Sequence, residues 1–522
     1  MREATTEIWK RFESGQEHHR RLGLYEKSAR AYRFFLGDQW YGMSEAGREL
    51  PVMNIVAPTI KNKVATVAQG QVSIHYLPIG GAGAARAESA ALCERLGELA
   101  ASNWERFKMD SLCWQVVKNA AITGESYLYF YDEDGRAEVL ENTSVYLGDK
   151  QCRDLQKQPY ILIAERRRVR EVREFARRCG ADEAEIERIV GDREVELLPS
   201  EQARGEVADG EGKVTVVLCL EKDERGIVHL SRATRQAVVQ PDTALYQTDH
   251  RGRVLGGVEL YPLAGFVWNR VPGSARGAGE AEALIANQLE INKTLARRAV
   301  AVKTFAFPRL IYDRDRLENP EALDEVGAPV AVENLGGGSV GEMISYLSPS
   351  PISGAAEALS NELVQLTREL AGAGDAAVGS VNPEKASGAA ILAVRDLAQL
   401  PLSEQAADFR QFCEDVAAIW LERWRLYHPE GVLVTDREGA QSLLSAEALA
   451  GLSAGIRVEV SSQSPYSLYA EQQALDNLFS AGALSFEEYV SLLSPSAALP
   501  KAKLEEVLRA RRAFENIAVP TA

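Results

Sequence analysis

The sequence predicts a multi-domain α+β fold with two long helices paired in the middle of the chain. Helix-forming sequence without proline or internal glycine extends from Gly279 to about Ala306, and a second helix is predicted from about Gly354 to Ala371. Short strand-like segments precede the first helix, separate the two and follow them. A chain of 522 residues is also too long for one hydrophobic core, so we expect two or more domains.

The two long helices are expected to pack antiparallel and form a strut. The first would be about 40 Å long at 1.5 Å per residue. Apolar residues recur along both helices at a 4/3 spacing, which gives each a narrow apolar stripe suited to another helix. The stripe comprises Leu284, Ile291, Leu295, Ala299 and Val302 in the first helix, with Gln288 as a polar exception, and Leu359, Leu363, Leu366 and Leu370 in the second. Such a strut suits a ring or tunnel better than an active site.

The N-terminal half alternates between helical and strand patterns. Helices are predicted over 4–36, with breaks at Gly15 and Gly23, from about 54 through 67, and over 86–123 as a pair that ends at Gly124. Strands are predicted at 71–78, 144–147, 159–164, 214–221, 227–239 and 261–268, and a hairpin over 125–141 turns at 132–135. The arginine-rich stretch 165–203 is expected to be a solvated helical excursion with ion pairs between turns.

The C-terminal half begins with the insert 307–352, predicted to be a small α/β module. A loop at 372–388 then leads into a long helix from about Ser387 to His428, which Pro401 should kink. Trp420 and Trp424 belong to a helical stripe that we expect to be buried. A strand at 456–462 and short helices at 468–481, 485–493 and 501–514 complete the chain.

Composition restricts the partners of the chain. The formal net charge is −16, whereas a protein that grips nucleic acid by its phosphates is usually basic, so any DNA contact should be local and transient. The six cysteines show no metal-ligand spacing and are expected to be buried free thiols. The N-terminus has no apolar signal core, and no stretch of about 18 apolar residues predicts a membrane span. We therefore expect a protein made in the cytoplasm, without a membrane partner.

No motif supports enzyme chemistry, a metal or a cofactor. The glycine-rich segment 80–89 lacks the Gly-Lys-Ser/Thr ending of a phosphate loop, and Gly336–Gly338 is expected to be a turn. Asp132-x-Asp134-Gly135 lacks the later ligands of a calcium loop and predicts a hairpin turn. His18 and His19 are expected to be surface residues. Asp313 and Asp315, which lie among arginines, should form ion pairs.

The order of these parts, together with local motifs, resembles the portal proteins of tailed bacteriophages, of the siphophage type. The motifs are Phe34-Phe35-Leu36-Gly37-Asp38-Gln39-Trp40 followed by Asn54, Ala120–Gly124 before a strand, Tyr261-Pro262, Gln288-x-x-x-Asn292, and Ser387-Gly388-x-Ala390. The segment 273–283 departs from the family pattern and leaves the subgroup open. The resemblance covers most of the chain.

The resemblance implies a portal fold: a β-rich and helical wing, a two-helix stem, an α/β clip, a long kinked helix and a helical crown. The implied domains are the N-terminal wing (1–265), linker and first stem helix (266–306), clip (307–352), second stem helix (353–371), tunnel loop (372–388), remaining wing (389–462) and crown (463–522). No ATPase belongs to this architecture.

The resemblance also implies a ring, usually a dodecamer, at one capsid vertex of the virion, assembled in the host cytoplasm. The ring would conduct double-stranded DNA during packaging and ejection. Its implied partners are the terminase large subunit, major capsid and scaffolding proteins, head-completion or adaptor proteins, and tail proteins.

Three groups of residues are the candidate sites. In the tunnel loop, Asn382 and Lys385 are the expected DNA contacts, with Asp375 and Ser380 beside them. Lys293 and Arg297 lie on one face of the first stem helix, where they would form belts of positive charge in a ring or ion pairs to neighbouring helices, for example through Glu290. In the clip, Arg309, Arg314 and Arg316 either meet partner proteins or form a solvated surface.

Two other functions remain open from the sequence. One is a monomeric or dimeric nucleic-acid-processing enzyme with a helical arm, and the other is an oligomeric scaffold without a DNA channel. The size of the particle in solution separates the portal from the enzyme. The width of its channel separates the portal from the scaffold.

Overall fold

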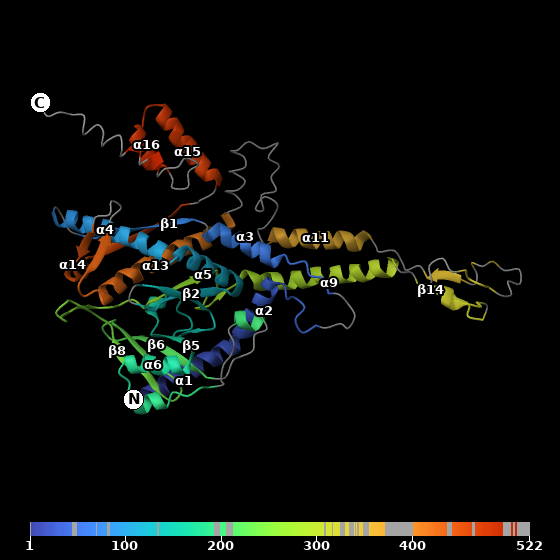
Figure 1. Cartoon of the computed structure of the whole chain (residues 1–522), viewed down its shortest axis with the longest axis horizontal. Coiled ribbons are helices and arrows are strands. Elements are labelled where there is room, and N and C mark those ends of the chain that lie inside the picture. The colour runs from blue at the N-terminus through green and yellow to red at the C-terminus, as the bar shows by residue number, and fades with distance from the viewer. Residues whose placement is uncertain are drawn as a thin grey trace.

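The computed structural model shows a mixed helical and β-sheet body from which a two-helix arm projects (Figure 1). It describes residues 2–43, 50–68, 70–80, 84–132, 135–192, 199–204, 212–306, 309–315, 317–323, 329–332, 339, 341, 344–347, 354–370, 400–435, 441–461, 465–493, 503–504 and 507–508. The predicted α+β class is confirmed. Gly336–Gly338, the 372–388 loop and most of 501–514 lie outside the described residues.

Two helices open the chain, α1 (Arg2–Leu22) and α2 (Leu24–Leu36), separated by Gly23 in the left-handed conformation with φ of 63°. The predicted break at Gly23 is confirmed, but the break predicted at Gly15 is wrong because α1 continues through it. A Cβ atom at Gly15 would lie 2.7 Å from Cδ1 of Tyr146. Gly15 therefore allows α1 to approach the sheet closely.

The largest sheet has the order β4-β5-β6-β7-β8: Val145–Leu147, Tyr160–Arg168, Lys213–Lys222, Val228–Ala233 and Val238–Ala244. Its faces alternate along the strands. Leu162 packs toward Trp9 and Phe12 of α1, whereas Ile161 and Ile163 pack toward the neighbouring three-stranded sheet. The single strand predicted at 227–239 is wrong, because Thr234 bonds to Ala237 in a turn that divides it into β7 and β8.

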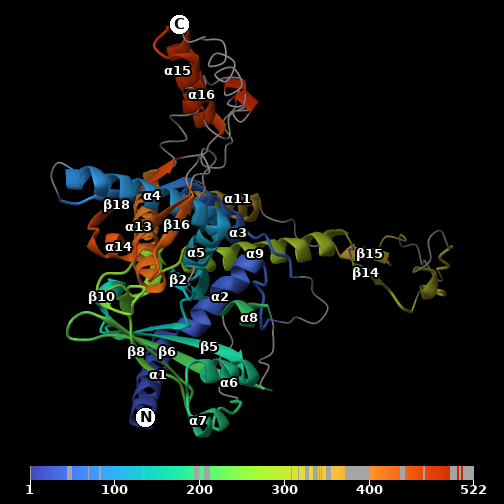
Figure 2. The ribbon, with the colours of Figure 1, turned by 60° about the vertical axis from the view of Figure 1, so that its left-hand side comes forward.

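The arginine-rich excursion also differs from the prediction. Arg166–Arg168 extend strand β5, and only then do α6 (Val169–Arg178), α7 (Glu183–Glu187) and α8 (Pro199–Ala203) follow. Val172 and Ile186 are buried with Val214 of β6 in a small core. Helices α6 and α7 therefore cover an end of the sheet with their apolar side and expose their charges, whereas α8 packs against α2 (Figure 2).

The main core unites distant parts of the chain. It joins α3 (Val56–Ala68), α4 (Ala84–Arg106), α5 (Met109–Thr123) and α13 (Ser403–Tyr427) to the sheet β11-β2-β3, which comprises Leu263–Val267, Glu125–Phe130 and Ala137–Glu141. The hairpin predicted over 125–141 is confirmed. Strand β1 (Gln71–Pro78) pairs with β18 (Ala454–Ser461), which brings the last strand back to the N-terminal half.

Helix α13 crosses this core and supplies its largest side chains. Trp420 and Trp424 are fully buried, as predicted, and Trp420 Nε1 donates to the Gly135 carbonyl at 3.0 Å. The kink predicted at Pro401 is wrong in the described residues, since Pro401 lies in a 3-10 turn, Leu400–Leu402, and α13 begins only at Ser403. A proline before a helix leaves no internal hydrogen bond unmade.

The smaller elements complete the body. They are β9 (Tyr246–Thr248), β10 (Val254–Gly257), β12 (Asn269–Arg270), β13 (Gly277–Ala278), α14 (Ala446–Gly451) and an unpredicted hairpin of β16 (Val432–Thr435) and β17 (Gln441–Leu444). A C-terminal pair, α15 (Pro465–Ser480) and α16 (Phe486–Leu492), is joined by the Tyr489 hydroxyl, which donates to Asp476. All six cysteines are free, but Cys152 and Cys179 are only half-buried, contrary to expectation, because they lie in connecting segments.

Replacing Trp420 with alanine should lower the free energy of unfolding by about 3–5 kcal/mol, since it opens a cavity and removes a buried hydrogen bond. Urea denaturation followed by circular dichroism measures the loss. Trp114→Ala is the matched control, because Trp114 is exposed on α5. Equal losses in the two variants would contradict the position assigned to α13 in the core.

Candidate functional site

The arm that projects from the body is the candidate functional site. Helix α9 (Glu280–Ala306) leaves the body, α11 (Gly354–Leu370) lies beside it, and β14 (Arg309–Tyr312) and β15 (Ile344–Leu347) pair at the far end (Figure 1). Both predicted long helices are therefore confirmed. The described part of the predicted α/β insert contains this two-stranded sheet and a 3-10 turn, Pro320–Leu323.

Gln288 and Asn292 hold the base of α9, one helical turn apart on its buried face. Gln288 accepts from Ile55 N at 2.9 Å and donates to the Met53 carbonyl at 2.8 Å, and Asn292 accepts from Met53 N at 3.1 Å. Asn292 also donates to Gln39 Oε1 at 2.6 Å. Gln288, the polar exception in the apolar stripe, thus provides hydrogen-bond partners for backbone groups of the segment before α3.

The arm base also brings together two of the motifs on which the family resemblance rests. Gln39 belongs to the FFLGDQW segment, and its amide donates to the Phe34 carbonyl at 3.0 Å. Asn54 donates to the Phe35 carbonyl at 3.2 Å and accepts from Ala57 N at 3.1 Å. These residues and the Gln288/Asn292 pair lie far apart in the sequence, yet they form one hydrogen-bonded cluster, which we call the polar anchor.

A second buried cluster holds the strand that leads into α9. Arg276 pairs with Glu125 at 2.8 Å, and the Gly277 amide donates to the other Glu125 oxygen. The approach is so close that a Cβ at Gly279 would lie 2.3 Å from the Ile122 carbonyl oxygen. Burial raises the pKa of Glu125, and the Arg276 guanidinium opposes this shift. The start of the arm is therefore fixed to β2 by charge and by backbone packing.

His19 completes this second cluster, and its predicted surface position is wrong. The imidazole is buried, stacks on Tyr146 with ring centroids 4.4 Å apart, and accepts through Nε2 from Arg276 at 2.6 Å. Burial, reinforced by the positive charge of Arg276, lowers the pKa of His19 to about 2. His19 is therefore neutral in the folded protein.

A third contact ties α9 to α3 and to the strand region beside it. Glu280, in the first turn of α9, accepts from Lys63 at 2.7 Å and from Trp268 Nε1 at 3.2 Å. A carboxylate at this position also interacts favourably with the positive end of the helix dipole. The three contacts together orient α9 relative to the body.

The candidate charges of the stem helix are partly compensated. Lys293 and Arg297 lie 3.5 Å and 3.4 Å from the Glu290 carboxylate, so Glu290 pairs with both cations within α9 itself and not across to a neighbouring helix. All three side chains are solvent-exposed. Two cations share one anion, which leaves a local excess of positive charge on this part of α9.

The remaining candidate residues lie toward the tip or outside the described residues. Arg309 is part of β14, and Arg314 is exposed in the turn that follows it. In that turn Asp315 N donates to Asp313 Oδ1 at 3.1 Å. Arg316 and the loop residues Asp375, Ser380, Asn382 and Lys385 lie outside the described residues, so their roles remain predictions.

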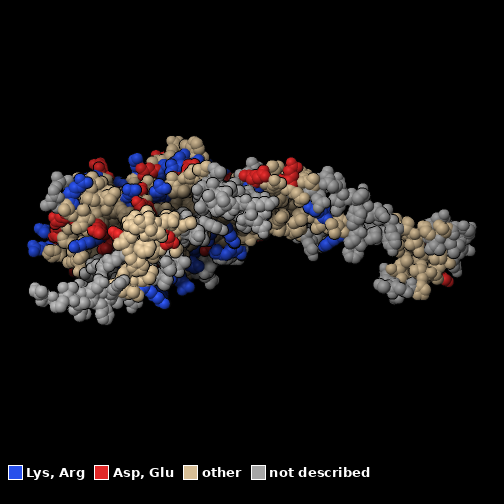
Figure 3. All heavy atoms as spheres, turned by 90° about the horizontal axis from the view of Figure 1, so that it is seen from above, with Lys and Arg blue, Asp and Glu red and all other residues tan. Residues whose placement is uncertain are grey.

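The apolar stripe of the arm is only partly covered. Leu284 and Ile291 are buried near the base, but Val302 on α9 is 58% exposed, and Leu359 and Leu366 on α11 are 53% and 46% exposed. The prediction that these three pack within the strut is wrong, since the arm of one chain covers only one side of each helix. Figure 3 shows the arm as a narrow extension with uncharged atoms between its charged groups.

Two other features of the described residues bear on chemistry. Asp249, His250 and Glu447 come close enough to hold a metal, but the Asp249 carboxylate already accepts from Arg251 N at 2.9 Å and Arg253 Nε at 2.6 Å. The turn at Asp132 closes as the predicted hairpin turn, with Arg136 N donating to its carboxylate. Within the described part of the chain, no helix is both long and apolar enough to span a membrane.

Comparison with known proteins gives likeness at the level of whole chains only. No protein-family model matches the sequence, and no curated protein matches it. A chain of the virion of a native gene transfer agent particle aligns with a TM-score of 0.36 and 13% identity, over 84% of this chain and 88% of that one. Chains of the necks of native and empty gene transfer agent particles, computed with C12 and C6 symmetry, align over the same shares at 12% identity, with TM-scores of 0.33 and 0.32. All three TM-scores are below 0.5, so these likenesses assign no function to this chain.

Replacing Gln288 with leucine should lower the free energy of unfolding by about 1–3 kcal/mol for each buried backbone group left unpaired. Hydrogen exchange should also become faster at the amide of Ile55, which donates to Gln288. Gln365→Leu is the control, because Gln365 is exposed on α11 and donates to Glu369 one turn along the same helix. Unchanged exchange in Q288L would show that the polar anchor does not hold this segment.

Acidification should destabilise the protein through His19. Its pKa is about 2 when folded and about 6.5 when unfolded, so the unfolded chain binds the extra proton between these values and stability falls as the pH drops below 6.5. At pH 5.5 the cost is about 1.4 kcal/mol relative to pH 7.5. Urea denaturation at both pH values should show this difference shrinking in His19→Gln. It should persist in His75→Gln, which alters an exposed histidine on β1.

Proposed function

We propose that the chain is the subunit of a portal ring at one capsid vertex, which conducts double-stranded DNA without reading its sequence. The observation that carries the proposal is the anchored arm with uncovered apolar side chains on both of its helices. In an isolated arm the apolar side chains of Leu359, Leu366 and Val302 remain exposed to water. In an arm packed between identical arms they would be buried, which is favourable. The motif order that resembles portal proteins supports the same assignment.

Ring geometry follows from the asymmetry of this surface. The exposed leucines lie on α11, and two exposed valines, Val300 and Val302, lie on α9, so the two sides of the arm differ. Contacts between different faces of identical subunits are head-to-tail, and they close into a ring when the rotation permits. The proposed ring has about twelve copies, as the family resemblance implies, and its stem is built from the arms.

The charges of the arm suit weak, transient contacts with passing DNA better than tight DNA binding. In the ring, Lys293 and Arg297 would form belts of positive charge, which Glu290 of the same chain partly compensates. A chain with a net charge of −16 otherwise repels a polyanion, so phosphate contacts stay weak, salt-sensitive and transient. The 372–388 loop, with Asn382 and Lys385, is proposed as a further contact with DNA.

The tip of the arm, with Arg309, Arg314 and Arg316, is proposed as the docking site of the terminase large subunit during packaging and of adaptor and tail proteins later. The body would meet capsid and scaffolding proteins. The protein would thus reside in the virion, after assembly in the host cytoplasm, and would carry no catalytic activity.

The ring is tested by measuring particle mass and by negative-stain imaging of the purified chain. Wild-type protein should form rings of roughly a dozen copies with a central hole wide enough for a DNA duplex. The variant Leu359→Asp/Leu366→Asp should reduce the ring population at least tenfold, because it places charge in the apolar contact between arms.

The control adds the same charge on the same helix at polar exposed positions, Asn361→Asp/Gln365→Asp, and should still form rings. Monomers or dimers of wild-type protein at all concentrations would refute the portal and favour an enzyme with a helical arm. An assembly without a central channel would instead favour the scaffold.

A further inference from the structure

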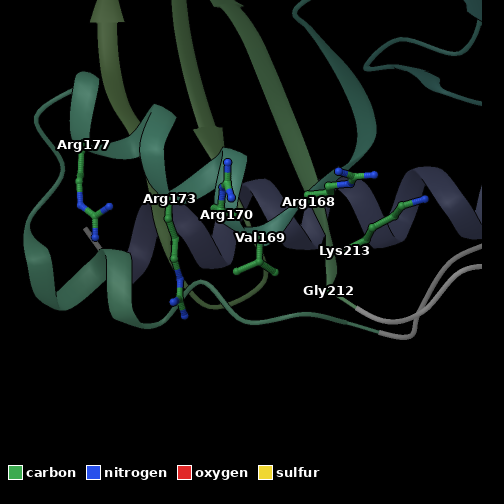
Figure 4. A pocket seen from close by; sticks show the side chains of 7 residues that line it. All are labelled: Arg168, Val169, Arg170, Arg173, Arg177, Gly212 and Lys213. Carbon is green, nitrogen blue, oxygen red and sulfur yellow. The ribbon is translucent and has the colours of Figure 1, made fainter.

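An open groove on the outer surface of the body gathers five basic side chains. It has a volume of about 560 Å³ and lies where β5 ends and α6 begins (Figure 4). Arg168, Arg170, Arg173, Arg177 and Lys213 line it, and no carboxylate does among the described residues. Such a concentration of cations stands out in a chain with a net charge of −16.

Two of these cations face each other across the sheet. Arg168 and Lys213 are directly opposite each other in the β5–β6 pairing, and like charges in such positions destabilise a sheet. Figure 4 shows the two side chains extending in the same direction. Arg168 is exposed, so its packing does not require an arginine at this position. An anion bound between the two cations would turn their repulsion into a favourable interaction.

Some of the basic side chains that line the groove are bonded within the protein, and others are available to bind an anion. Arg173 donates to the Ile189 carbonyl at 2.8 Å, and Arg177 pairs with Glu183 at 3.2 Å, so both are partly engaged. Arg170 is exposed, and neither it nor Arg168 has an ion pair within the described part of the chain. The positive end of α6 lies in the same groove, and its cap residue, Arg168, makes no side-chain capping bond.

We propose that this groove binds the phosphate backbone of a nucleic acid. Guanidinium groups match phosphate oxygens in a bidentate geometry. Among the described residues, Val169 is the single large apolar one that lines the groove, so they form neither an enclosed apolar pocket for the base of a free nucleotide nor an apolar centre for a protein interface. This inference rests on the groove alone and holds whether or not the chain forms a portal ring.

Fluorescence anisotropy with a labelled random-sequence DNA duplex of about 20 base pairs tests the proposal across a series of salt concentrations. In Arg168→Gln/Arg170→Gln, the slope of log K against log salt should decrease in magnitude by about two, because two phosphate contacts are lost. The matched control, Arg86→Gln/Arg95→Gln, removes two exposed arginines from α4 and should keep the wild-type slope. DNA contacts elsewhere in a ring are common to all variants and cancel in this comparison.

The charge-retaining variant Arg168→Lys/Arg170→Lys should also keep the slope, which separates loss of charge from loss of folding. Equal slopes in the glutamine variant and its control would overturn the proposal, and so would absence of duplex binding at low salt. Two competitors, ATP and polyglutamate, distinguish the other anions. Displacement of the duplex at lower concentrations of either one than of unlabelled duplex would assign the groove to a nucleotide or to an acidic protein instead.

Discussion

The position of the arm depends on the need to satisfy buried backbone groups where α9 meets the body. The segment before α3 runs along α9, and Ile55 in it is buried. A buried backbone group is costly when it is left unpaired. Gln288 and Asn292 supply the missing partners from one face of α9. The hydrogen-bonding requirement that folds the N-terminal segment therefore also fixes the direction of the arm.

A single anchor would leave α9 free to pivot, and the second cluster removes that freedom. Arg276 pairs with Glu125 and donates to His19, so the strand before α9 is bonded both to β2 and to α1. Gly277 and Gly279 let the two backbones approach within a distance that any side chain would prevent. A long helix amplifies small rotations at its base, so two separate attachments are what a rigid arm requires.

Local patterns in the sequence predict the elements well, and long-range packing accounts for the errors. The stem helices and the 125–141 hairpin follow from periodicity and turn residues near each other in the chain. Gly15 and His19 were misjudged because Tyr146 and Arg276, which explain them, are more than a hundred positions away. In the sequence, Gln288 is only a polar interruption of an apolar stripe, because the spacing of residues within a helix does not predict its distant backbone partners. The stripe itself cannot distinguish contacts within a chain from contacts between chains, so it does not predict that Leu359 and Leu366 are exposed in the single chain.

A ring of acidic subunits must also overcome repulsion between its members, and the arm is where the charges permit close contact. Helix α9 has three acidic and four basic residues, whereas α11 has three acidic residues and one basic residue. The two helices thus carry opposite net charge. In the proposed head-to-tail ring, α11 of one copy would face α9 of the next, so the apolar contact and the attraction between opposite charges would coincide. The repulsion between bodies is screened over about 8–10 Å at physiological salt. The contacts between arms would then contribute most to whether the proposed ring assembles.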